Sequence, residues 1–272
     1  MKFIFIAVNY NGFRFTCDYI SSVQSIRRDS SDLVETIIVD NGSKLEEYDR
    51  LKAHSEEMEN VQLIRLDENI GYFRGLNVGI SRVDKGDDVV LVVGNNDLTF
   101  DEDFIINYKA IDLMDDNLVV APNITTKYGR QQNPHVIDRV GKMEKFKSKL
   151  YYSNYYVGQA FKILNSVLKK LLKTDTKNFV NNYGQMKIKR GIGACYILPP
   201  KFFQFFDKLD DHVFLWGEEV LLSSQVESVS GTTLYVPTLK IIHHESASVA
   251  KIASRKRYNI NKASYQIYKK DL

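Results

Sequence analysis

Short apolar segments alternate with longer, more polar ones along the first 120 residues of the chain. The apolar segments are rich in β-branched residues and have the length of strands that are buried on both faces of a parallel sheet. The segments between them have the length of helices. We predict strands at residues 3–8, 34–39, 61–66, 89–93 and 118–121. We predict helices at roughly residues 13–28, 43–58, 72–83 and 101–115.

This alternation predicts the α/β class, with one open, mostly parallel sheet and helices on both of its faces. Ligands of such sheets bind beyond the carboxyl ends of the strands. A turn or a helix cap explains any single cluster of Asn, Asp and Gly at a strand end. Four such clusters at one edge favour a cleft for a polar ligand. The clusters are Asn9-Tyr10-Asn11-Gly12, Asp40-Asn41-Gly42-Ser43, Asp67-Glu68-Asn69-Ile70-Gly71 and Gly94-Asn95-Asn96-Asp97.

The second half of the chain is less regular. We expect loops and strands after residue 122 and then a helix over residues 161–173, where apolar residues recur at helical spacing with lysines between them. A basic amphipathic helix of this kind either lies on a membrane surface or packs on its own domain. The remaining segments predict a strand at 191–200, a helix at 212–226, two short strands at 233–237 and 239–244, and a helical tail.

Charge is divided unevenly between the two halves of the chain. Residues 1–141 carry 15 Lys and Arg against 24 Asp and Glu, whereas residues 142–272 carry 22 against 10. Such a positive excess indicates an anionic partner, and nucleic acid, phospholipid headgroups and a pyrophosphate-linked acceptor all fit it. An uneven distribution without a function is the alternative.

The composition is that of an ordinary globular protein, with 44% hydrophobic and 26% charged residues. We expect no transmembrane helix, because no apolar run approaches the required length. The apolar start is too short for a signal peptide and is expected to form the first strand. Cys17 and Cys195 lie far apart in the sequence, so we expect reduced thiols and a cytoplasmic location.

Three groups of residues could carry chemistry. Asp97, with Asn95 beside it, offers hard oxygen ligands for Mg²⁺ or Mn²⁺, although the same segment also makes a good turn. Glu218 and Glu219 could interact favourably with the dipole of a helix that begins there, or one of them could act as a general base. Adjacent helix positions point about 100° apart, so both are not expected to face one substrate atom. His243 could complete a metal site or be a buried structural residue.

Several known motifs are missing from the chain. It contains no GxGxxG, GxxxxGK[ST], GxSxG or HExxH sequence, which argues against dehydrogenases, P-loop proteins and the common hydrolases. Taken in order, the segments described above resemble family 2 glycosyltransferases with the GT-A fold, particularly the bacterial rhamnosyltransferase-like branch. The segments that carry the resemblance are VNYNG, IIVDNGS, NIGYFRGLNVGI, VVGNND, GACYILPP, FLWGEEVLLS and IIHHESAS.

The resemblance covers about residues 2–123 and 190–250. It implies a GT-A domain with a nucleotide-sugar-binding half at residues 1–123 and an acceptor-binding half at residues 124–250. A basic helix at residues 251–272 would follow, in a helical, basic region on the acceptor side.

The resemblance also implies roles for individual residues. Glu219 is the expected general base, with Glu218 in support, and both stand where the family has an ED motif. Asp97 is the expected principal metal ligand and His243 a second one, because Asn95 replaces the first carboxylate of the family's DxD motif. The residues expected at the donor nucleotide are Asn9, Asp40, Asn69, Arg74, Asn77, Asn95 and Asn96.

Two departures from the family's pattern bear on these roles. Arg74 is displaced from the place where relatives carry a basic residue. Leu221 stands where relatives often have a further aspartate.

The activity implied by the resemblance is inverting transfer of a sugar from a dTDP- or UDP-sugar to a saccharide acceptor, assisted by Mg²⁺ or Mn²⁺. A polyprenyl-pyrophosphate acceptor in O-antigen or capsule synthesis would place the enzyme in the cytoplasm, at the inner face of the membrane. The alternatives are a silent nucleotide- or glycan-binding module and a sugar nucleotidyltransferase, whose glycine-rich signature the first strand lacks. No nucleic acid partner is expected, because the chain has no recognition motif.

Overall fold

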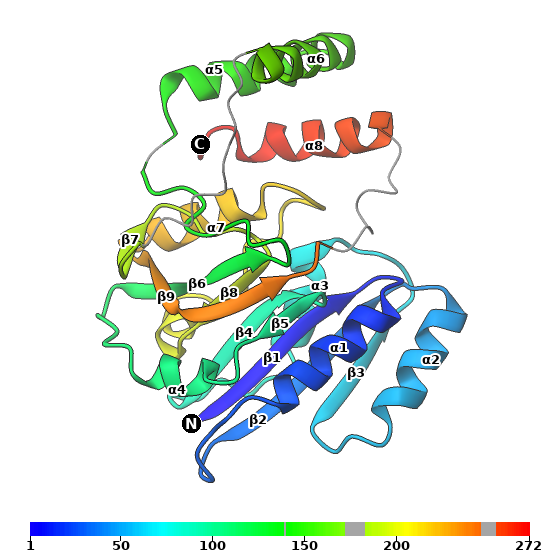
Figure 1. Cartoon of the computed structure of the whole chain (residues 1–272), viewed down its shortest axis with the longest axis vertical. Coiled ribbons are helices and arrows are strands. Elements are labelled where there is room, and N and C mark those ends of the chain that lie inside the picture. Colours follow the sequence, from blue (N-terminus) through cyan, green and yellow to red (C-terminus); the bar gives the residue numbers. More distant parts are fainter. Residues whose placement is uncertain (139, 172–182, 246–253) are drawn as a thin grey trace.

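The computed structural model of the chain describes residues 1–138, 140–171, 183–245 and 254–272. One twisted sheet forms the centre of the molecule, and helices α5, α6 and α8 lie together at the top of the view in Figure 1. The strands are β1 (Lys2–Asn9), β2 (Leu33–Asn41), β3 (Val61–Leu66), β4 (Val89–Asn95), β5 (Leu98–Phe100), β6 (Asn117–Thr126), β7 (Met186–Ile188), β8 (Cys195–Leu198) and β9 (Thr232–His243). The helices are α1 (Phe13–Gln24), α2 (Leu45–Ser55), α3 (Tyr72–Ile80), α4 (Phe104–Lys109), α5 (Lys142–Tyr151), α6 (Tyr155–Leu171), the 3-10 helix η1 (Pro200–Gln204), α7 (Glu218–Glu227) and α8 (Ser254–Tyr268).

The strands of the described chain form a nine-stranded sheet in the order β3-β2-β1-β4-β8-β6-β9-β5, with β7 paired to β9. The first four strands in this order are parallel. Beyond β4, strands β8, β7 and β5 pair antiparallel to their neighbours, whereas β6 and β9 run parallel to each other. The predicted α/β class, with a central sheet flanked by helices, is confirmed.

Helices cover both faces of the sheet, and β1 shows why. Phe3 and Phe5 point to the face that α1 and α4 cover. Ile4 and Ile6 point to the opposite face, where α3 and α7 pack. Each of these side chains is at most 1% exposed, and burial of one such side chain contributes about 1.5–3 kcal/mol. The continuous apolar runs in the sequence therefore reflect strands that are buried on both faces.

The register of the parallel strands brings their polar ends together. Asn9 at the end of β1 lies opposite Asp40 of β2, and Val8 lies opposite Asn95 of β4. Since the carboxyl ends of parallel strands share one edge of the sheet, the Asn- and Asp-rich turns meet there.

Helix α7 begins at Glu218 rather than near residue 212, as the sequence suggested. Trp216 and Gly217 have φ angles of 65° and 100°, which are incompatible with a helix. The two short strands expected at residues 233–244 form the single strand β9 instead, and its pairing with β6 shifts register between Pro122 and Asn123.

Two further elements differ from the expectation. The helix expected at residues 101–115 is confined to α4, and strand β5, which was not predicted, pairs with β9 immediately before it. Helix α5 was not predicted, and none of its residues is buried. Residues 172–173 of the predicted amphipathic helix lie outside the described part of the chain.

Tyrosine rings hold the C-terminal helix α8 to α5 and α6. Tyr152 stacks on Tyr265 with 4.5 Å between ring centroids, and Tyr258 lies 5.2 Å from Tyr155 and 5.8 Å from Tyr151. The three helices therefore form one packed layer. Among the described residues, no helix combines the length and the apolar character needed to cross a membrane.

Candidate active site

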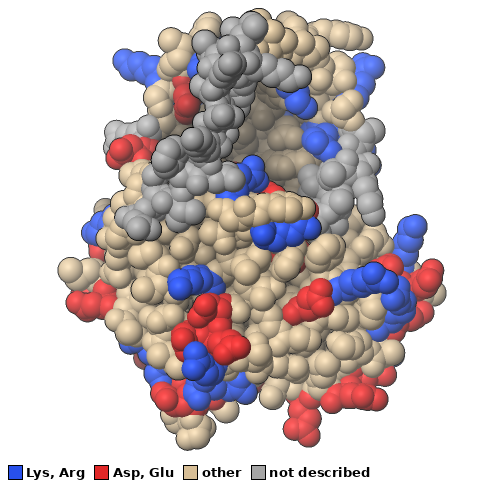
Figure 2. Space-filling model, in the orientation of Figure 1, with Lys and Arg blue, Asp and Glu red and all other residues tan. Residues whose placement is uncertain are grey.

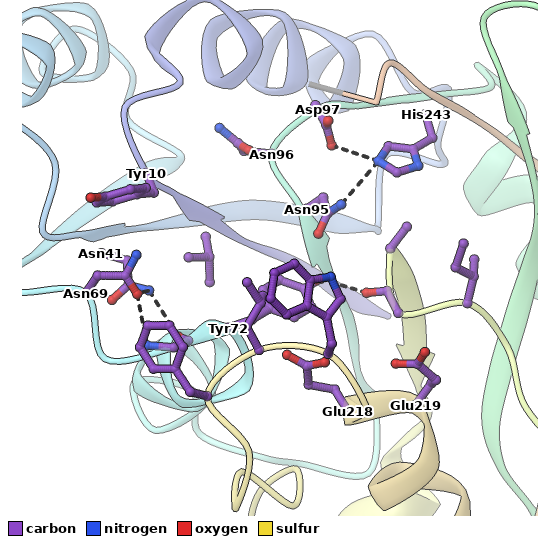
Figure 3. A pocket seen from close by; sticks show the side chains of 18 of the residues that line it. Tyr10, Asn41, Asn69, Tyr72, Asn95, Asn96, Asp97, Glu218, Glu219 and His243 are labelled. Atoms are coloured by element: carbon purple, nitrogen blue, oxygen red, sulfur yellow. Dashed lines mark hydrogen bonds and ion pairs between the residues drawn. The ribbon is translucent and has the colours of Figure 1, made fainter. Parts of the chain in front are cut away.

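A cavity of about 470 Å³ lies at the carboxyl edge of the parallel strands. Figure 3 shows its labelled side chains, with Asn95, Asp97 and His243 on one side and Glu218 and Glu219 on the other. The end of β2, the start of α3, and segments 192–194 and 214–219 complete the lining. Residues from both halves of the sequence therefore meet in one cavity.

A buried network of hydrogen bonds supports the strand ends beside this cavity. The Asn9 amide donates to Asp40 (2.7 Å), and its carbonyl oxygen accepts from Thr16 (3.0 Å) and Asn96 (3.1 Å). Asp40 also accepts from the backbone N–H of Ser43 (3.1 Å). Asn9 and Asp40 are fully buried and are not among the lining residues. Both were predicted to contact a nucleotide, and the structure places them one layer beneath the cavity wall.

Asn41 and Asn69 form the wall at the ends of β2 and β3. The Asn41 amide donates to Asn69 (3.2 Å) and to the Gly71 carbonyl (3.0 Å), while its oxygen accepts from the Ile70 N–H (2.9 Å). Gly71 has a φ of 105°, and an added Cβ would lie 2.6 Å from the Phe214 carbonyl. Glycine is therefore required where the wall meets the segment that leads into α7.

Asp97 and His243 approach each other across the pairing of β5 with β9. The distance between an Asp97 carboxylate oxygen and His243 Nε2 is 3.3 Å, and Asn95 lies 3.2 Å from the same nitrogen. Nδ1 of His243 lies 2.8 Å from the Gln132 side-chain oxygen, to which it donates in the tautomer that this contact selects. Nε2 of His243 is thus the ring nitrogen that faces Asp97 and Asn95. The sequence predicted this grouping across almost 150 residues.

Glu218 and Glu219 line the cavity at different depths. Glu218 is 4% exposed, and its Oε1 has no hydrogen-bond partner within the described part of the chain. Burial, together with the smaller effect of the neighbouring charge of Glu219, raises the pKa of Glu218 to about 8. Glu219 is half-buried. At neutral pH the buried carboxyl is therefore mostly protonated.

The raised pKa of Glu218 predicts a pH dependence of stability. The folded protein keeps this proton between about pH 4.5 and pH 8, whereas the unfolded chain loses it, so the free energy of unfolding falls as the pH rises through this window. Glu218→Gln removes this titrating group. The free energy of unfolding of the variant minus that of the wild type should therefore rise by on the order of 3 kcal/mol between pH 5 and pH 8. Urea denaturation at both pH values measures this difference.

The matched control for this prediction is Glu57→Gln, an exposed glutamate on the connection after α2. Its stability relative to the wild type should not change with pH. A Glu218→Gln variant that keeps the wild-type pH dependence would contradict the assignment of a neutral carboxyl.

Arg74 and Asn77 are not brought to the cavity. The Arg74 Nε donates to the Asp211 carbonyl (3.1 Å), and the Asn77 amide donates to the Leu209 carbonyl (2.9 Å) and to the Asp211 carboxylate (2.9 Å). Asn77 also accepts from the Leu209 N–H (3.0 Å). Both residues were predicted at the donor nucleotide. In the structure they tie α3 to the segment that precedes the glutamates.

Helix α8 supports the glutamate-bearing turn from the other side. The Ser264 hydroxyl donates to the Leu215 carbonyl (2.8 Å), and the Ser224 hydroxyl of α7 donates to the Asp271 carboxylate (3.1 Å). An added Cβ at Gly217 would lie 2.3 Å from the Tyr268 ring. The C-terminal helix therefore sets the position from which Glu218 and Glu219 enter the cavity.

Sequence reasoning missed several lining residues. Tyr10 and Asn41 belong to the polar clusters at the strand ends, so a signal for them was present. Tyr72 and Trp216 lie in two of the segments that carry the family resemblance, but neither was assigned to the site, since aromatic residues are more often part of the core. The Tyr72 hydroxyl donates to the Gly193 carbonyl (2.9 Å), which joins the start of α3 to the 192–194 segment.

Two comparisons with solved structures show the same fold. GalNAc-T7, crystallised with UDP, GalNAc and Mn²⁺, is 16% identical with a TM-score of 0.60, over 90% of this chain and 44% of that chain. S. aureus TarS 1-349 in complex with UDP-GlcNAc is 12% identical with a TM-score of 0.57, over 96% of this chain and 64% of that one. The chain thus spans less than two thirds of the length of each neighbour.

At the level of sequence, a search of curated proteins finds no match. A family model described as Glycosyl transferase family 2 matches residues 6–172. This match covers more than half of the chain, and the central sheet flanked by helices agrees with the GT-A neighbours. The chain belongs to glycosyl transferase family 2.

Proposed function

We propose that the chain is an inverting glycosyltransferase that moves a sugar from a UDP- or dTDP-sugar to a hydroxyl of a saccharide acceptor. The observation that carries this proposal is the content of one cavity, which holds polar amides, a carboxylate–imidazole pair and a half-buried glutamate. The family match and the UDP in both neighbours support a nucleoside-diphosphate donor.

The nucleoside would bind at the ends of β1, β2 and β3. Tyr10 is 44% exposed at the cavity rim and offers a ring on which a base can stack. Asn41 and Asn69 offer amide groups for the base or the ribose. Asn9 and Asp40 would contribute indirectly, because their hydrogen bonds hold these strand ends in place. Asn96 donates to Asn9 and also lines the cavity.

Asp97 and His243 fit a divalent cation. Two cis ligands of an octahedral Mg²⁺ at its usual bond length are ~3 Å apart, and the Asp97 oxygen and His243 Nε2 are 3.3 Å apart. The contact of Nδ1 with Gln132 would orient the imidazole for this task. When bound, Mg²⁺ or Mn²⁺ would neutralise charge on the departing diphosphate. The Mn²⁺ bound to GalNAc-T7 supports this assignment.

The described residues offer few side chains that could coordinate the metal ion. No group of three His, Cys, Asp or Glu side chains suited to a metal is found among the described residues. Diphosphate oxygens and water would therefore supply the rest of the coordination, with Asn95 beside them. We expect the cation to bind together with the donor and only weakly without it.

The two glutamates would have different roles in proton transfer. Glu219 would accept the proton of the acceptor hydroxyl while that oxygen attacks the anomeric carbon and the bond to the diphosphate breaks. Attack opposite the leaving group inverts the configuration at the anomeric carbon. Glu218, protonated at neutral pH, would not compete with Glu219 for the proton of the acceptor hydroxyl.

The acceptor assignment rests on charge and on family resemblance. Residues 142–272 carry 22 Lys and Arg against 10 Asp and Glu, which suits a saccharide on a polyprenyl pyrophosphate. We assign donor binding to residues 1–123, acceptor binding to residues 124–250, and a supporting role to the helix within residues 251–272. Surface polysaccharide synthesis by a rhamnosyltransferase-like enzyme, at the cytoplasmic face of the membrane, is part of this proposal.

Calorimetric titration with UDP, dTDP, GDP, CDP and ADP, each with and without Mn²⁺, tests the donor site. One nucleotide should bind more tightly than the others, with an affinity that Mn²⁺ raises. Tyr10→Ala should weaken that binding by roughly 5- to 150-fold, since stacking of a base on an aromatic ring contributes about 1–3 kcal/mol.

Tyr128→Ala is the control for this titration, because Tyr128 is exposed and does not line the cavity. Its nucleotide affinity should equal that of the wild type. Failure of all five nucleotides to bind, with or without metal, would overturn the proposed function.

A further inference from the structure

Within the described part of the chain, no element covers a stripe of apolar side chains on helix α5. Met143, Phe146 and Leu150 are 66%, 61% and 39% exposed. Their spacing of three and four residues places them on one side of the helix. Lys145, on a different side, reaches the C-terminal residue Leu272. The apolar stripe of α5 therefore faces away from the end of the chain.

Helix α6 continues this pattern. Its exposed apolar side chains follow one another at helical spacing. They are Tyr156, Val157, Ile163, Leu164 and Val167.

The opposite side of α6 packs on α8. Gly158 is buried there, and an added Cβ would meet Tyr258 at 3.1 Å. The apolar stripe therefore points away from α8 and from the sheet. We call the two stripes together the α5–α6 face.

Lysines of α5 border the α5–α6 face. Residues 142–151 contain four lysines and one glutamate, and three of these lysines, other than Lys145, flank the apolar stripe. On α5, the 100° step per residue places Lys147 on one flank of the apolar stripe and Lys142 and Lys149 on the other. In Figure 2, the described residues at the top of the molecule, where Figure 1 places α5 and α6, are mostly uncharged, with blue side chains at both sides.

We propose that the α5–α6 face docks on an anionic lipid bilayer. Its apolar side chains would enter the boundary between headgroups and acyl chains, and the flanking lysines would meet the lipid phosphates. The biological reason for such docking rests on the proposed function, since a lipid-linked acceptor would be presented at a bilayer surface. Its physical basis is the exposed apolar area and the charge around it, which do not depend on the reaction.

The charge pattern favours lipid over a second copy of the chain. In a two-fold symmetric dimer the same face meets itself, so the lysines of one copy would lie near those of the other. Like charges brought together across an interface oppose association. An anionic bilayer instead offers opposite charge to the lysines and an apolar interior to Phe146 and Ile163.

Co-sedimentation with vesicles tests this assignment on the full chain. The wild type should bind vesicles that contain phosphatidylglycerol more tightly than vesicles of phosphatidylcholine alone, and added salt should release it. Phe146→Ser, Ile163→Ser and Leu164→Ser combined should weaken binding at least about tenfold. Lys142→Gln, Lys147→Gln and Lys149→Gln combined should do the same for phosphatidylglycerol vesicles only.

The matched control replaces exposed apolar residues elsewhere. Leu33→Ser, Leu45→Ser and Met114→Ser combined should leave vesicle binding unchanged, although these side chains are as exposed as those of the α5–α6 face. All variants should bind the donor nucleotide like the wild type. This readout shows that the variants are folded, and it separates failure of the docking proposal from failure of the proposed function.

Three outcomes would overturn the docking assignment. The first is equal binding of the wild type to both kinds of vesicle, and the second is undiminished binding by the serine variant. The third is a dimer of the wild type, seen by light scattering, that the serine substitutions dissociate. That result would show that a second copy covers the α5–α6 face.

Discussion

Replacing Glu219 with glutamine is expected to lower the rate of sugar transfer by about 10²–10⁴-fold, the usual contribution of a general base. Glutamine keeps the size of the side chain but cannot accept the proton of the acceptor hydroxyl. Nucleotide affinity should be unchanged, because the proposed nucleoside site lies at Tyr10, Asn41 and Asn69. Turnover of the nucleotide-sugar and calorimetric affinity, measured on the same preparation, separate the two effects.

Glu57→Gln provides a charge-matched control away from the cavity and should retain full turnover. A Glu219→Gln variant with full turnover would move the base to another residue. If the wild type binds a nucleotide but transfers no sugar to any acceptor offered, a silent binding module becomes the better account.

Replacing Asp97 with asparagine is expected to remove most of the effect of Mn²⁺. A metal that neutralises a developing diphosphate contributes several kcal/mol, which corresponds to about 10³-fold in rate. The Asn95 amide beside it cannot replace the charge of Asp97. Nucleotide affinity in the absence of metal should change little. Titrations with and without Mn²⁺, together with turnover, measure both quantities.

The control for this variant is Asp112→Asn, an exposed aspartate on the loop after α4. His243→Asn should weaken the Mn²⁺ effect in the same direction as Asp97→Asn, because both side chains would hold the same ion. An undiminished Mn²⁺ effect in Asp97→Asn would place the metal elsewhere.

The parallel half of the sheet was predictable because its strands are buried on both faces. Such strands carry continuous apolar runs, and their turns carry residues with specific backbone needs. Strand β5 and helix α5 gave weaker signals. β5 is three residues long and depends on its pairing with β9, which is distant in sequence. α5 buries none of its residues, and its sequence offers only a short apolar stripe among four lysines.

The site residues that could be predicted are those at the ends of strands, because the sheet fixes where a strand end lies. Asn95, Asp97 and His243 meet because β4, β5 and β9 converge at one edge. Asn77 shows the limit of such reasoning. Helix α3 presents it to Leu209, and that side of the helix depends on a segment more than 130 residues away.

The most direct test of the account is a crystal structure with Mn²⁺ and the nucleoside diphosphate that calorimetry selects. We expect an anomalous signal for Mn²⁺ within bonding distance of the Asp97 carboxylate and His243 Nε2. We also expect the base beside Tyr10 and the diphosphate at the metal. A nucleotide bound outside this cavity, or Mn²⁺ bound away from Asp97, would contradict the assignment of the donor site.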